Sequence, residues 1–312
     1  MGAVQAQLEQ PGRTRTAWSQ TAVRPVALVA NGSASGLGHS RDALDDALRV
    51  LRSRGARVEA HLTESVAELA ATWPELLDRR VVLLGGDGTV HAVANLPFGP
   101  PELALLPAGR ANNIARALGI PTDLAAAADL AVNGHVRPVD LISATNGAHS
   151  MLAVEGVSVG LHALARAGYV APNSADVRAA VRTGLATAWG FDGVSLCISS
   201  DGETELLRLG QLFVANLSLY AFGLRVAPAA RATDGLFDVV ALPWEGRARI
   251  LPMLVRLRRG THVGREGVRT WTARRVRVGT RGESPVIADT VNLGPGPVTL
   301  EVAPAASPLV RP

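Results

Sequence analysis

Residues 81–89 read VVLLGGDGT and place a glycine-rich turn directly after a run of four apolar residues. The apolar run is typical of a buried strand, and a helical pattern begins after the turn. At such a junction backbone N–H groups point toward solvent, and glycines let a phosphate approach the main chain. The stretch therefore predicts a phosphate-binding turn, with an ordinary turn capped by an aspartate as the alternative. The candidate residues are Gly85, Gly86, Asp87, Gly88 and Thr89. Because Asp87 would repel a phosphate, we expect it to orient the turn or to hold a metal-bound water.

Short apolar runs and helical patterns alternate through residues 26–135. Strand–helix–strand repetition predicts a parallel sheet with helices on both faces. The expected strands are residues 26–30, 56–62, 81–84 and 103–106, and the expected helices are residues 41–54 and 64–73.

From about residue 137 the pattern changes to valine-rich segments separated by glycine and proline, which predicts antiparallel strands. The expected fold class is α/β, with an N-terminal doubly wound parallel sheet domain followed by a β-rich C-terminal domain. The expected divisions are a disordered leader at 1–24, a parallel α/β domain at 25–136 and a β-rich domain at 137–312. Helices are expected within the second domain at residues 175–187 and 247–258.

Two further loops of small residues follow expected strands, at residues 31–38 (NGSASGLG) and 106–113 (LPAGRANN). The carboxyl ends of parallel strands meet at one sheet edge, so the three loops predict a ligand-binding crevice there. Arg110 would supply the cation that no lysine can supply. The alternatives are ordinary glycine-serine loops and a solvated surface arginine. The added candidate residues are Asn31, Ser33, Ser35, Gly36, Gly109, Arg110 and Asn112.

The composition excludes several classes of protein. All 31 residues of the Lys and Arg total are arginine, so Schiff-base lysine chemistry and a P-loop lysine are excluded. The single Cys197 excludes disulfide scaffolds, and its place in an alternating strand predicts a buried side chain. Aromatic residues make up 4% of the 312, which argues against nucleic-acid binding. The sequence contains no run of 18 apolar residues, so no transmembrane helix is predicted.

The motifs together resemble the diacylglycerol kinase catalytic family of bacterial soluble lipid kinases, which is related to sphingosine kinases and NAD kinases. The resemblance rests on GGDGT, on the Asn/Ser/Gly loop before it, and on residues 107–116, which fit PAG-x-A-N-x-x-A-R. It continues at residues 228–239, where Pro-Ala-Ala leads to DGLFDV, and it covers about residues 24–312.

The resemblance implies a nucleotide-binding domain at 25–136 and a sandwich-like lipid- or substrate-binding domain at 137–312. It implies an enzyme that uses ATP and Mg²⁺ to phosphorylate a lipid hydroxyl between the two domains. It implies Asp289 as the carboxylate base, Asp234 and Asp238 as residues that hold a structural Mg²⁺, and Thr63 as a residue near the nucleotide. The alternatives are a surface-turn aspartate at 289 and a strand-capping turn at 234–238.

The chain departs from the family pattern at polar positions. Thr290 and Val291 replace the Gly and Glu of a D-G-E motif, and Ala92, Arg110 and Asn113 replace the usual Glu, Thr and Asp. These departures leave two alternatives open: a non-catalytic or weakly active member that binds nucleotide or lipid, and a kinase for a soluble acceptor such as NAD or a specialised metabolite.

Ten arginines between residues 247 and 277 predict contact with anionic lipid headgroups, with a solvated face as the alternative. The expected partner is therefore a lipid substrate at a membrane surface, and nucleic acid is not expected. A homodimer stays open. The expected location is the cytoplasm, with peripheral contact at the inner face of the membrane.

Overall fold

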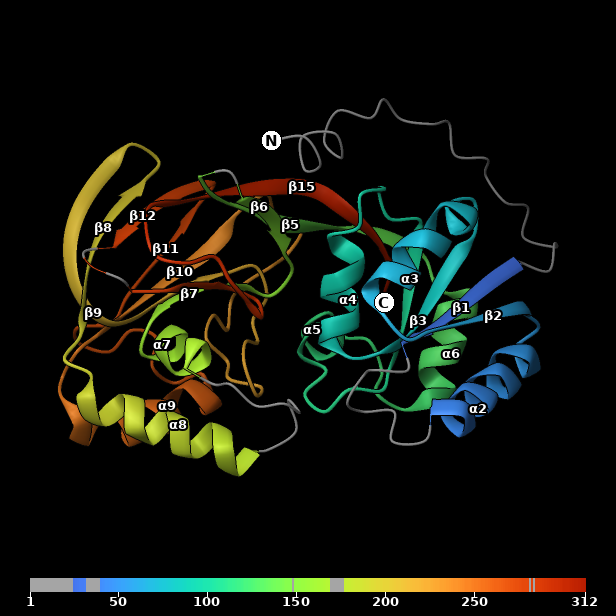
Figure 1. Ribbon diagram of the computed structural model, residues 1–312, viewed down its shortest axis with the longest axis horizontal. Coiled ribbons are helices and arrows are strands. Elements are labelled where there is room, and N and C mark those ends of the chain that lie inside the picture. Colours follow the sequence, from blue (N-terminus) through green and yellow to red (C-terminus); the bar gives the residue numbers. More distant parts are fainter. Residues whose placement is uncertain (1–24, 32–39, 148, 169–176, 281, 283) are drawn as a thin grey trace. The chain divides into compact units, whose positions relative to one another are not determined.

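The computed structural model describes residues 25–31, 40–147, 149–168, 177–280, 282 and 284–312. These residues form two compact units (Figure 1), which divide between Val139 and Asp140. The chain returns to the N-terminal unit at its end, because residues 305–312 cluster with residues up to Val139. The expected C-terminal domain extended to residue 312, so the last strand differs from the expectation: β15 (Val298–Val310) begins in one unit and ends in the other.

The N-terminal unit is built on a parallel sheet. Its strands are β1 (Pro25–Asn31), β2 (Arg57–Thr63), β3 (Arg80–Gly85) and β4 (Glu102–Pro107), in the order β2-β1-β3-β4. The end of β15 adds a parallel pair at the edge, Leu309 with Leu103. Both faces of β3 are buried, as Val81, Val82 and Leu83 show. Such continuous apolar burial is typical of a parallel sheet covered on both sides.

Helices α2 (Ser40–Ser53) and α6 (Leu124–Asn133) cover one face of this sheet. Alternate strand residues such as Leu28 and Val82 pack against Leu51 of α2 and Ala131 of α6. The unit also contains α3 (Val66–Thr72), α4 (Asp87–Ala94), α5 (Asn113–Ala117) and the 3₁₀ helix η1 (Trp73–Leu76).

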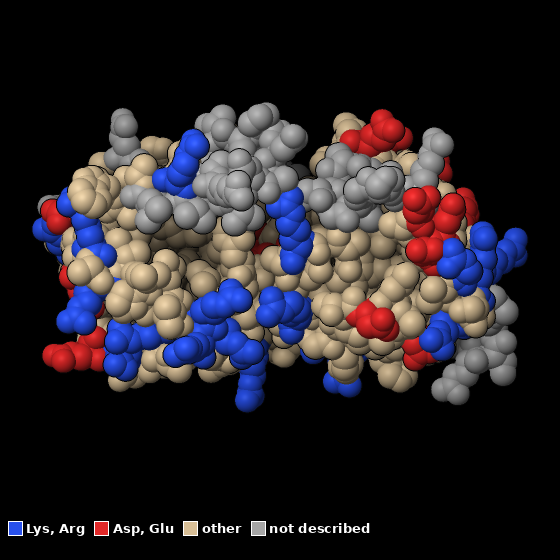
Figure 2. All heavy atoms as spheres, turned by 90° about the horizontal axis from the view of Figure 1, so that it is seen from below, with Lys and Arg blue, Asp and Glu red and all other residues tan. Residues whose placement is uncertain are grey.

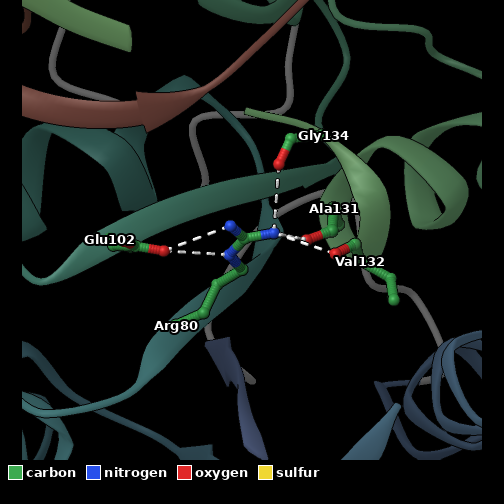
Figure 3. A network of polar contacts seen from close by, with 5 residues as sticks. All are labelled: Arg80, Glu102, Ala131, Val132 and Gly134. Atoms are coloured by element: carbon green, nitrogen blue, oxygen red, sulfur yellow. Dashed lines mark hydrogen bonds and ion pairs between the residues drawn. The ribbon is translucent and has the colours of Figure 1, made fainter. Parts of the chain in front are cut away.

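A buried arginine ties the end of α6 to the sheet (Figure 3). Arg80 is 5% exposed, and its guanidinium donates to a Glu102 carboxylate oxygen from Nε at 3.2 Å and from Nη2 at 3.1 Å. Its Nη1 donates to the carbonyls of Ala131 and Val132 at 2.9 and 3.0 Å. The cation therefore satisfies carbonyls at the C-terminus of α6, where the helix dipole favours positive charge.

The C-terminal unit is an antiparallel assembly around the long strand β9 (Glu203–Ala215). The first half of β9 pairs with β8, and the second half pairs with β7 and β10. The strands of this unit include β6 (His149–Ala153), β7 (Gly156–Gly160), β8 (Val194–Ser200), β10 (Phe237–Pro243), β11 (Arg269–Ala273), β12 (Arg275–Thr280), β13 (Val286–Ala288) and β14 (Val291–Asn292). Strand β5 (Val136–Asn146) enters from the N-terminal unit and pairs with β6.

Three helices accompany these strands: α7 (Leu161–Ala167), α8 (Val177–Gly190) and α9 (Ile250–Arg259), with a 3₁₀ turn η2 (Arg247–Arg249) before α9. Among the described helices, none has the length and apolar character needed to cross a membrane.

The expected fold class is confirmed: a parallel α/β unit precedes a β-rich unit. Two local expectations differ from the structure. Cys197 is exposed, because Val194, Leu196 and Ile198 occupy the inward phase of β8 and Cys197 falls on the outward phase. Helix α6 was not expected, because its alanine-rich sequence carries little contrast between polar and apolar faces. The leader at residues 1–24 and residues 32–39 lie outside the described residues.

Candidate functional site

Two of the predicted loops meet at the carboxyl end of the parallel sheet. Strands β3 and β4 are neighbours, and the Ala108 amide after β4 donates to the Gly85 carbonyl at 2.9 Å. A Cβ placed on Gly86 would lie 2.8 Å from the Gly109 Cα, and a Cβ on Gly109 would lie 2.6 Å from the Gly86 Cα. The two turns therefore touch backbone to backbone, and no side chain fits at either position.

Asp87 connects the same two loops. Its carboxylate accepts hydrogen bonds from the backbone amides of Asn113 and Ile114, each at 3.0 Å. These amides belong to the first turn of α5, which has no intrahelical acceptor for them. Asp87 thus orients the turn, which is one of the two roles expected of it.

Asn112 closes the second loop on itself. Its backbone is left-handed (φ 47°), its Oδ1 accepts from the Gly109 amide at 2.9 Å, and its Nδ2 donates to the Gly109 carbonyl at 2.8 Å. Asn112 was expected among the nucleotide-binding residues. In the structure its side chain holds Gly109 in place.

The start of α4 offers backbone donors. Gly86 is the N-cap, and the hydrogen bonds of the first turn begin with the Thr89 amide, which donates to the Gly86 carbonyl at 3.0 Å. The amides of Asp87 and Gly88 precede that bond. A Cβ on Gly88 would meet no atom of the described residues within 4 Å, so those residues leave this side of the turn open. The hollow between the two loops measures about 10 Å³, which is about the space that one water molecule needs, so an anion does not fit inside it.

The remaining predicted residues of this unit lie at or near the same edge. Asn31 ends β1 and is paired in register with Thr63, which ends β2. The Thr63 side chain is 2% exposed and donates to the Ala30 carbonyl at 3.4 Å, so it holds the strand ends together. Thr89 is buried and Arg110 is exposed. Ser33, Ser35 and Gly36 lie outside the described residues.

In the C-terminal unit, Asp289 was expected to be a catalytic base, and the structure gives its carboxylate other partners. The carboxylate is 7% exposed and accepts the backbone amides of Val154, Glu155 and Gly156 at 2.7, 2.9 and 3.0 Å. A carboxylate has about four lone-pair positions, and three of them receive amide protons here. Asp289 therefore fits a clamp on the 154–156 turn better than an unencumbered proton acceptor.

A buried polar chain extends from this clamp. The Tyr220 hydroxyl donates to the Asp289 carbonyl at 3.3 Å and lies 3.5 Å from the Ser158 hydroxyl, which is 2.9 Å from His162 Nδ1. Burial, reinforced by the Asp289 charge, raises the pKa of Tyr220. Burial, reinforced by the Arg166 charge, lowers the pKa of His162 to about 4. Both groups are neutral at physiological pH.

An apolar cavity of about 320 Å³ lies next to His162. It is bounded by helices α7, α8 and α9 and by β9 and β10, and its size falls in the range of small-molecule pockets. The walls include Leu161, Phe213, Ile250, Met253 and Leu257. The family resemblance implies a substrate-binding domain here, but no sequence motif singles out these residues.

Asp234 and Asp238, the expected metal ligands, interact electrostatically. Burial, and secondarily the Asp234 charge, raises the pKa of Asp238 to about 6. A divalent cation would reduce the electrostatic repulsion between the two carboxylates. Asp234 is exposed and accepts from the Leu236 amide at 3.1 Å. In the described part of the chain, no group of three or more His, Cys, Asp or Glu side chains is placed to hold a metal ion. Two carboxylates alone could serve only a Mg²⁺ that keeps most of its water ligands.

Asp140 is a buried structural residue that belongs to none of the sequence motifs. It is 5% exposed, and its carboxylate accepts the Gly235 amide at 2.9 Å. Its carbonyl accepts from Asn216 Nδ2 at 2.7 Å. The available signal was an aspartate inside the apolar strand β5, since a buried carboxylate requires hydrogen-bond donors.

The chain matches two family profiles. Residues 25–144 match the diacylglycerol kinase catalytic domain, and residues 155–311 match the YegS C-terminal NAD kinase beta sandwich-like domain.

Curated relatives carry related names. The chain is 29% identical over 291 residues to a diacylglycerol kinase of Mycobacterium tuberculosis, covering 89% of this chain and 92% of the relative. It is 28% identical over 252 residues to a diacylglycerol kinase of Bacillus subtilis, covering 75% and 79%. A crystal structure of a diacylglycerol kinase from Bacillus anthracis superposes with a TM-score of 0.70 at 21% identity, covering 93% of this chain and 97% of that one, which supports the fold.

Proposed function

Because the chain belongs to the diacylglycerol kinase family, we propose that it transfers the γ-phosphate of ATP to a hydroxyl group of a diacylglycerol-like lipid. In this reaction the lipid oxygen attacks the γ-phosphorus, the bond to the β-phosphate oxygen breaks, and ADP and a proton are released. The N-terminal unit would bind the nucleotide and the C-terminal unit the lipid.

The observation that carries the proposal is the contact between Gly86 and Gly109. A side chain on either residue would push the two turns apart. Glycine at both positions therefore allows the two strand-to-helix junctions to contact each other. Such junctions present backbone amides to anions, and the chain has no lysine to supply the cation of a P-loop. We place the phosphates at the face of the turn beside Gly88 and assign the exposed Arg110, on the adjoining loop, as a cation for them.

The cavity beside His162 supports a lipid acceptor. Its walls are mainly aliphatic and aromatic, and His162 is neutral there. Transfer of an acyl chain into such a cavity removes apolar surface from water. This burial stabilises the bound lipid by about 25 cal/mol for each Å² of apolar surface that is buried. A sugar or nucleotide acceptor would need charged or hydrogen-bonding walls instead.

Asp234 and Asp238 would hold a structural Mg²⁺, which when bound would offset the repulsion between the two carboxylates. The other contributions come from the chain's own residues. Asp87 connects the two loops, Asn112 closes the second loop around Gly109, and Asp289 holds the 154–156 turn beside Tyr220. Phosphoryl transfer depends chiefly on positioning and charge stabilisation, so clamped residues of this kind suit it.

The decisive experiment is transfer of labelled phosphate from ATP to diacylglycerol in mixed micelles with Mg²⁺. The variant Ala165→Phe fills the cavity from α7, and Ala186→Phe is the matched control on the exposed side of α8. We expect Ala165→Phe to lose activity on long-chain diacylglycerol and Ala186→Phe to retain it. Equal activity of both variants would contradict the role of the cavity, and the absence of any labelled lipid would contradict the function.

A non-catalytic member is the second candidate, and one observation favours it: the Asp289 carboxylate already accepts three amides. Binding of ATP without phosphate transfer to any lipid would support this candidate.

A kinase for a soluble acceptor is the third candidate. A polar groove of about 650 Å³ beside β11 supports it, but Arg269 there is paired with Glu205 at 2.6 Å. Phosphorylation of NAD in the same assay would favour this candidate over a lipid kinase.

A further inference from the structure

We propose that α9 and the end of α8 form a docking surface for a bilayer containing anionic phospholipid. This proposal rests on the proposed function, which supplies the identity of the substrate. It adds the face of the protein through which a lipid would enter. We define the docking surface by the exposed apolar residues Trp189, Leu251, Leu254 and Val255 and by the flanking arginines Arg247, Arg249, Arg258 and Arg259.

Helix α9 is apolar on two sides. Its inner side carries Ile250, Met253 and Leu257, which line the cavity. Its outer side carries Leu251 and Val255, which are 70% and 42% exposed. A surface helix ordinarily turns polar residues outward, so an apolar outer side indicates a second apolar partner.

Arginines lie at both ends of this apolar outer side. Arg247 and Arg249 precede α9, and Arg258 and Arg259 end it; all four are exposed. Figure 2 views the side on which α8 and α9 lie, and basic side chains gather over the part formed by the C-terminal unit, with few acidic ones among them. An apolar strip bordered by arginines matches a bilayer surface, where acyl chains lie beneath anionic headgroups.

Trp189 extends the surface onto α8. Its side chain is 75% exposed, and the Arg247 guanidinium lies 5.2 Å from the centre of its ring. Tryptophan favours the boundary between headgroups and hydrocarbon, where its ring is apolar and its N–H remains hydrated. The contact with Arg247 therefore joins an interfacial aromatic residue to the basic border.

The cavity shares its walls with this surface. Leu254 is 43% exposed and also lines the cavity, as does Arg249 at the start of α9. A bilayer seated on α9 would lie beside residues that line the cavity. Docking would therefore bring lipid to the cavity without passing its acyl chains through water. Exposure of acyl chains to water is unfavourable.

The test is co-sedimentation of the purified full chain with vesicles that lack diacylglycerol, in the absence of ATP. One set of vesicles is phosphatidylcholine alone, and the other also contains phosphatidylglycerol. We expect binding to the second set. Leu251→Glu should weaken it about tenfold or more. The matched control Leu206→Glu alters a leucine that is 59% exposed on β9 and should bind as the unaltered protein does.

The arginines are tested in the same way. Arg258→Gln and Arg259→Gln should each weaken binding to anionic vesicles about fivefold. Arg277→Gln removes the same charge from an exposed position on β12 and should have little effect. A blue shift of tryptophan fluorescence on adding anionic vesicles should disappear in Trp189→Phe.

Three results would overturn the proposal. The first is equal binding by Leu251→Glu and Leu206→Glu, and the second is equal binding to neutral and anionic vesicles. The third is a dimer, seen by light scattering, that Leu251→Glu dissociates, since the surface would then belong to a second copy. Vesicle binding without lipid phosphorylation would contradict the proposed function alone, and phosphorylation of short-chain diacylglycerol without vesicle binding would contradict docking alone.

Discussion

Gly86 and Gly109 approach so closely that a Cβ on either one would lie within 3 Å of the other's Cα. The contact joins the turn after β3 to the turn after β4 at the sheet edge where α/β proteins bind ligands. Since the obstacle on each side is backbone, rotation of a side chain cannot relieve it. The geometry of the candidate phosphate site therefore depends on both residues being glycine.

Substitution of Gly109 by alanine tests this dependence. Gly109→Ala should lower the free energy of unfolding by about 1–3 kcal/mol through overpacking, and it should abolish ATP binding in calorimetry. Gly99→Ala is the matched control in the same unit, because a Cβ at Gly99 meets nothing within 4 Å. It should leave ATP binding unchanged. Undiminished ATP binding by a folded Gly109→Ala protein would refute the site.

Asp87 offers a second test, because its carboxylate accepts two amides of α5 across the loops. Asp87→Ala should cost about 1–2 kcal/mol of stability and weaken ATP binding as the loops separate. Asp123→Ala removes the N-cap of α6, whose carboxylate accepts the Ala126 amide at 2.9 Å. It should cost a similar amount of stability and leave ATP binding intact. Equal ATP affinities for the two variants would show that Asp87 serves α5 alone.

Asp289→Asn separates a clamp from a base. Asparagine tolerates the left-handed backbone at this position (φ 51°) but offers one oxygen where the carboxylate uses two for three amides. We expect a loss of about 1–3 kcal/mol of stability, measured by denaturant unfolding. Asp201→Asn is the matched control: Asp201 is also left-handed (φ 45°) and accepts two amides, but it is exposed, so its loss should be small. Full stability with lost activity would return Asp289 to the role of base.

Sequence reasoning located the turns because their signals are local. A glycine run after an apolar strand indicates a turn, and parallel strands bring their carboxyl ends to one edge. Residues 85–89 and 109–112 were therefore named in advance, and the structure brings them together. The partners of Asp87 and Asn112 could not be predicted in the same way, because they depend on which loop amides each side chain reaches.

Asp289 shows the same limit from the other side. Its position in an eroded motif identified a carboxylate but not the amides of residues 154–156, which are more than 130 positions away in the chain. The cavity walls likewise come from α7, α8, α9, β9 and β10. Their juxtaposition is a property of tertiary packing, and periodicity within one segment carries no information about it.

The free energy of unfolding should decrease as the pH is lowered below 6.5, because His162 is buried in its neutral form. The folded state lowers the pKa of this imidazole from 6.5 to about 4, first through burial and then through Arg166. Protons therefore favour the unfolded state: the stability that neutral His162 contributes is complete above pH 6.5 and is lost as pH falls through about 4. The loss amounts to about 3 kcal/mol. In urea unfolding at a series of pH values, His162→Phe should flatten this dependence. His149→Phe, at an exposed histidine, should keep it. Parallel curves for His162→Phe and the unaltered protein would contradict the assignment.

Asp238 should give stability the opposite pH dependence to that of His162, and Mg²⁺ should cancel it. Its pKa is raised from 3.8 to about 6, first by burial and then by Asp234, so ionisation destabilises the folded state as pH rises through about 6. The cost is about 1 kcal/mol, since Asp238 is half-buried and water screens part of the repulsion. Mg²⁺ at the two carboxylates would offset that cost, so it should raise the melting temperature above pH 6 and have little effect below pH 4. Asp238→Asn should melt higher than the unaltered protein without Mg²⁺ and should not respond to it, whereas the control Asp201→Asn should respond normally. A normal Mg²⁺ response in Asp238→Asn would place the cation elsewhere.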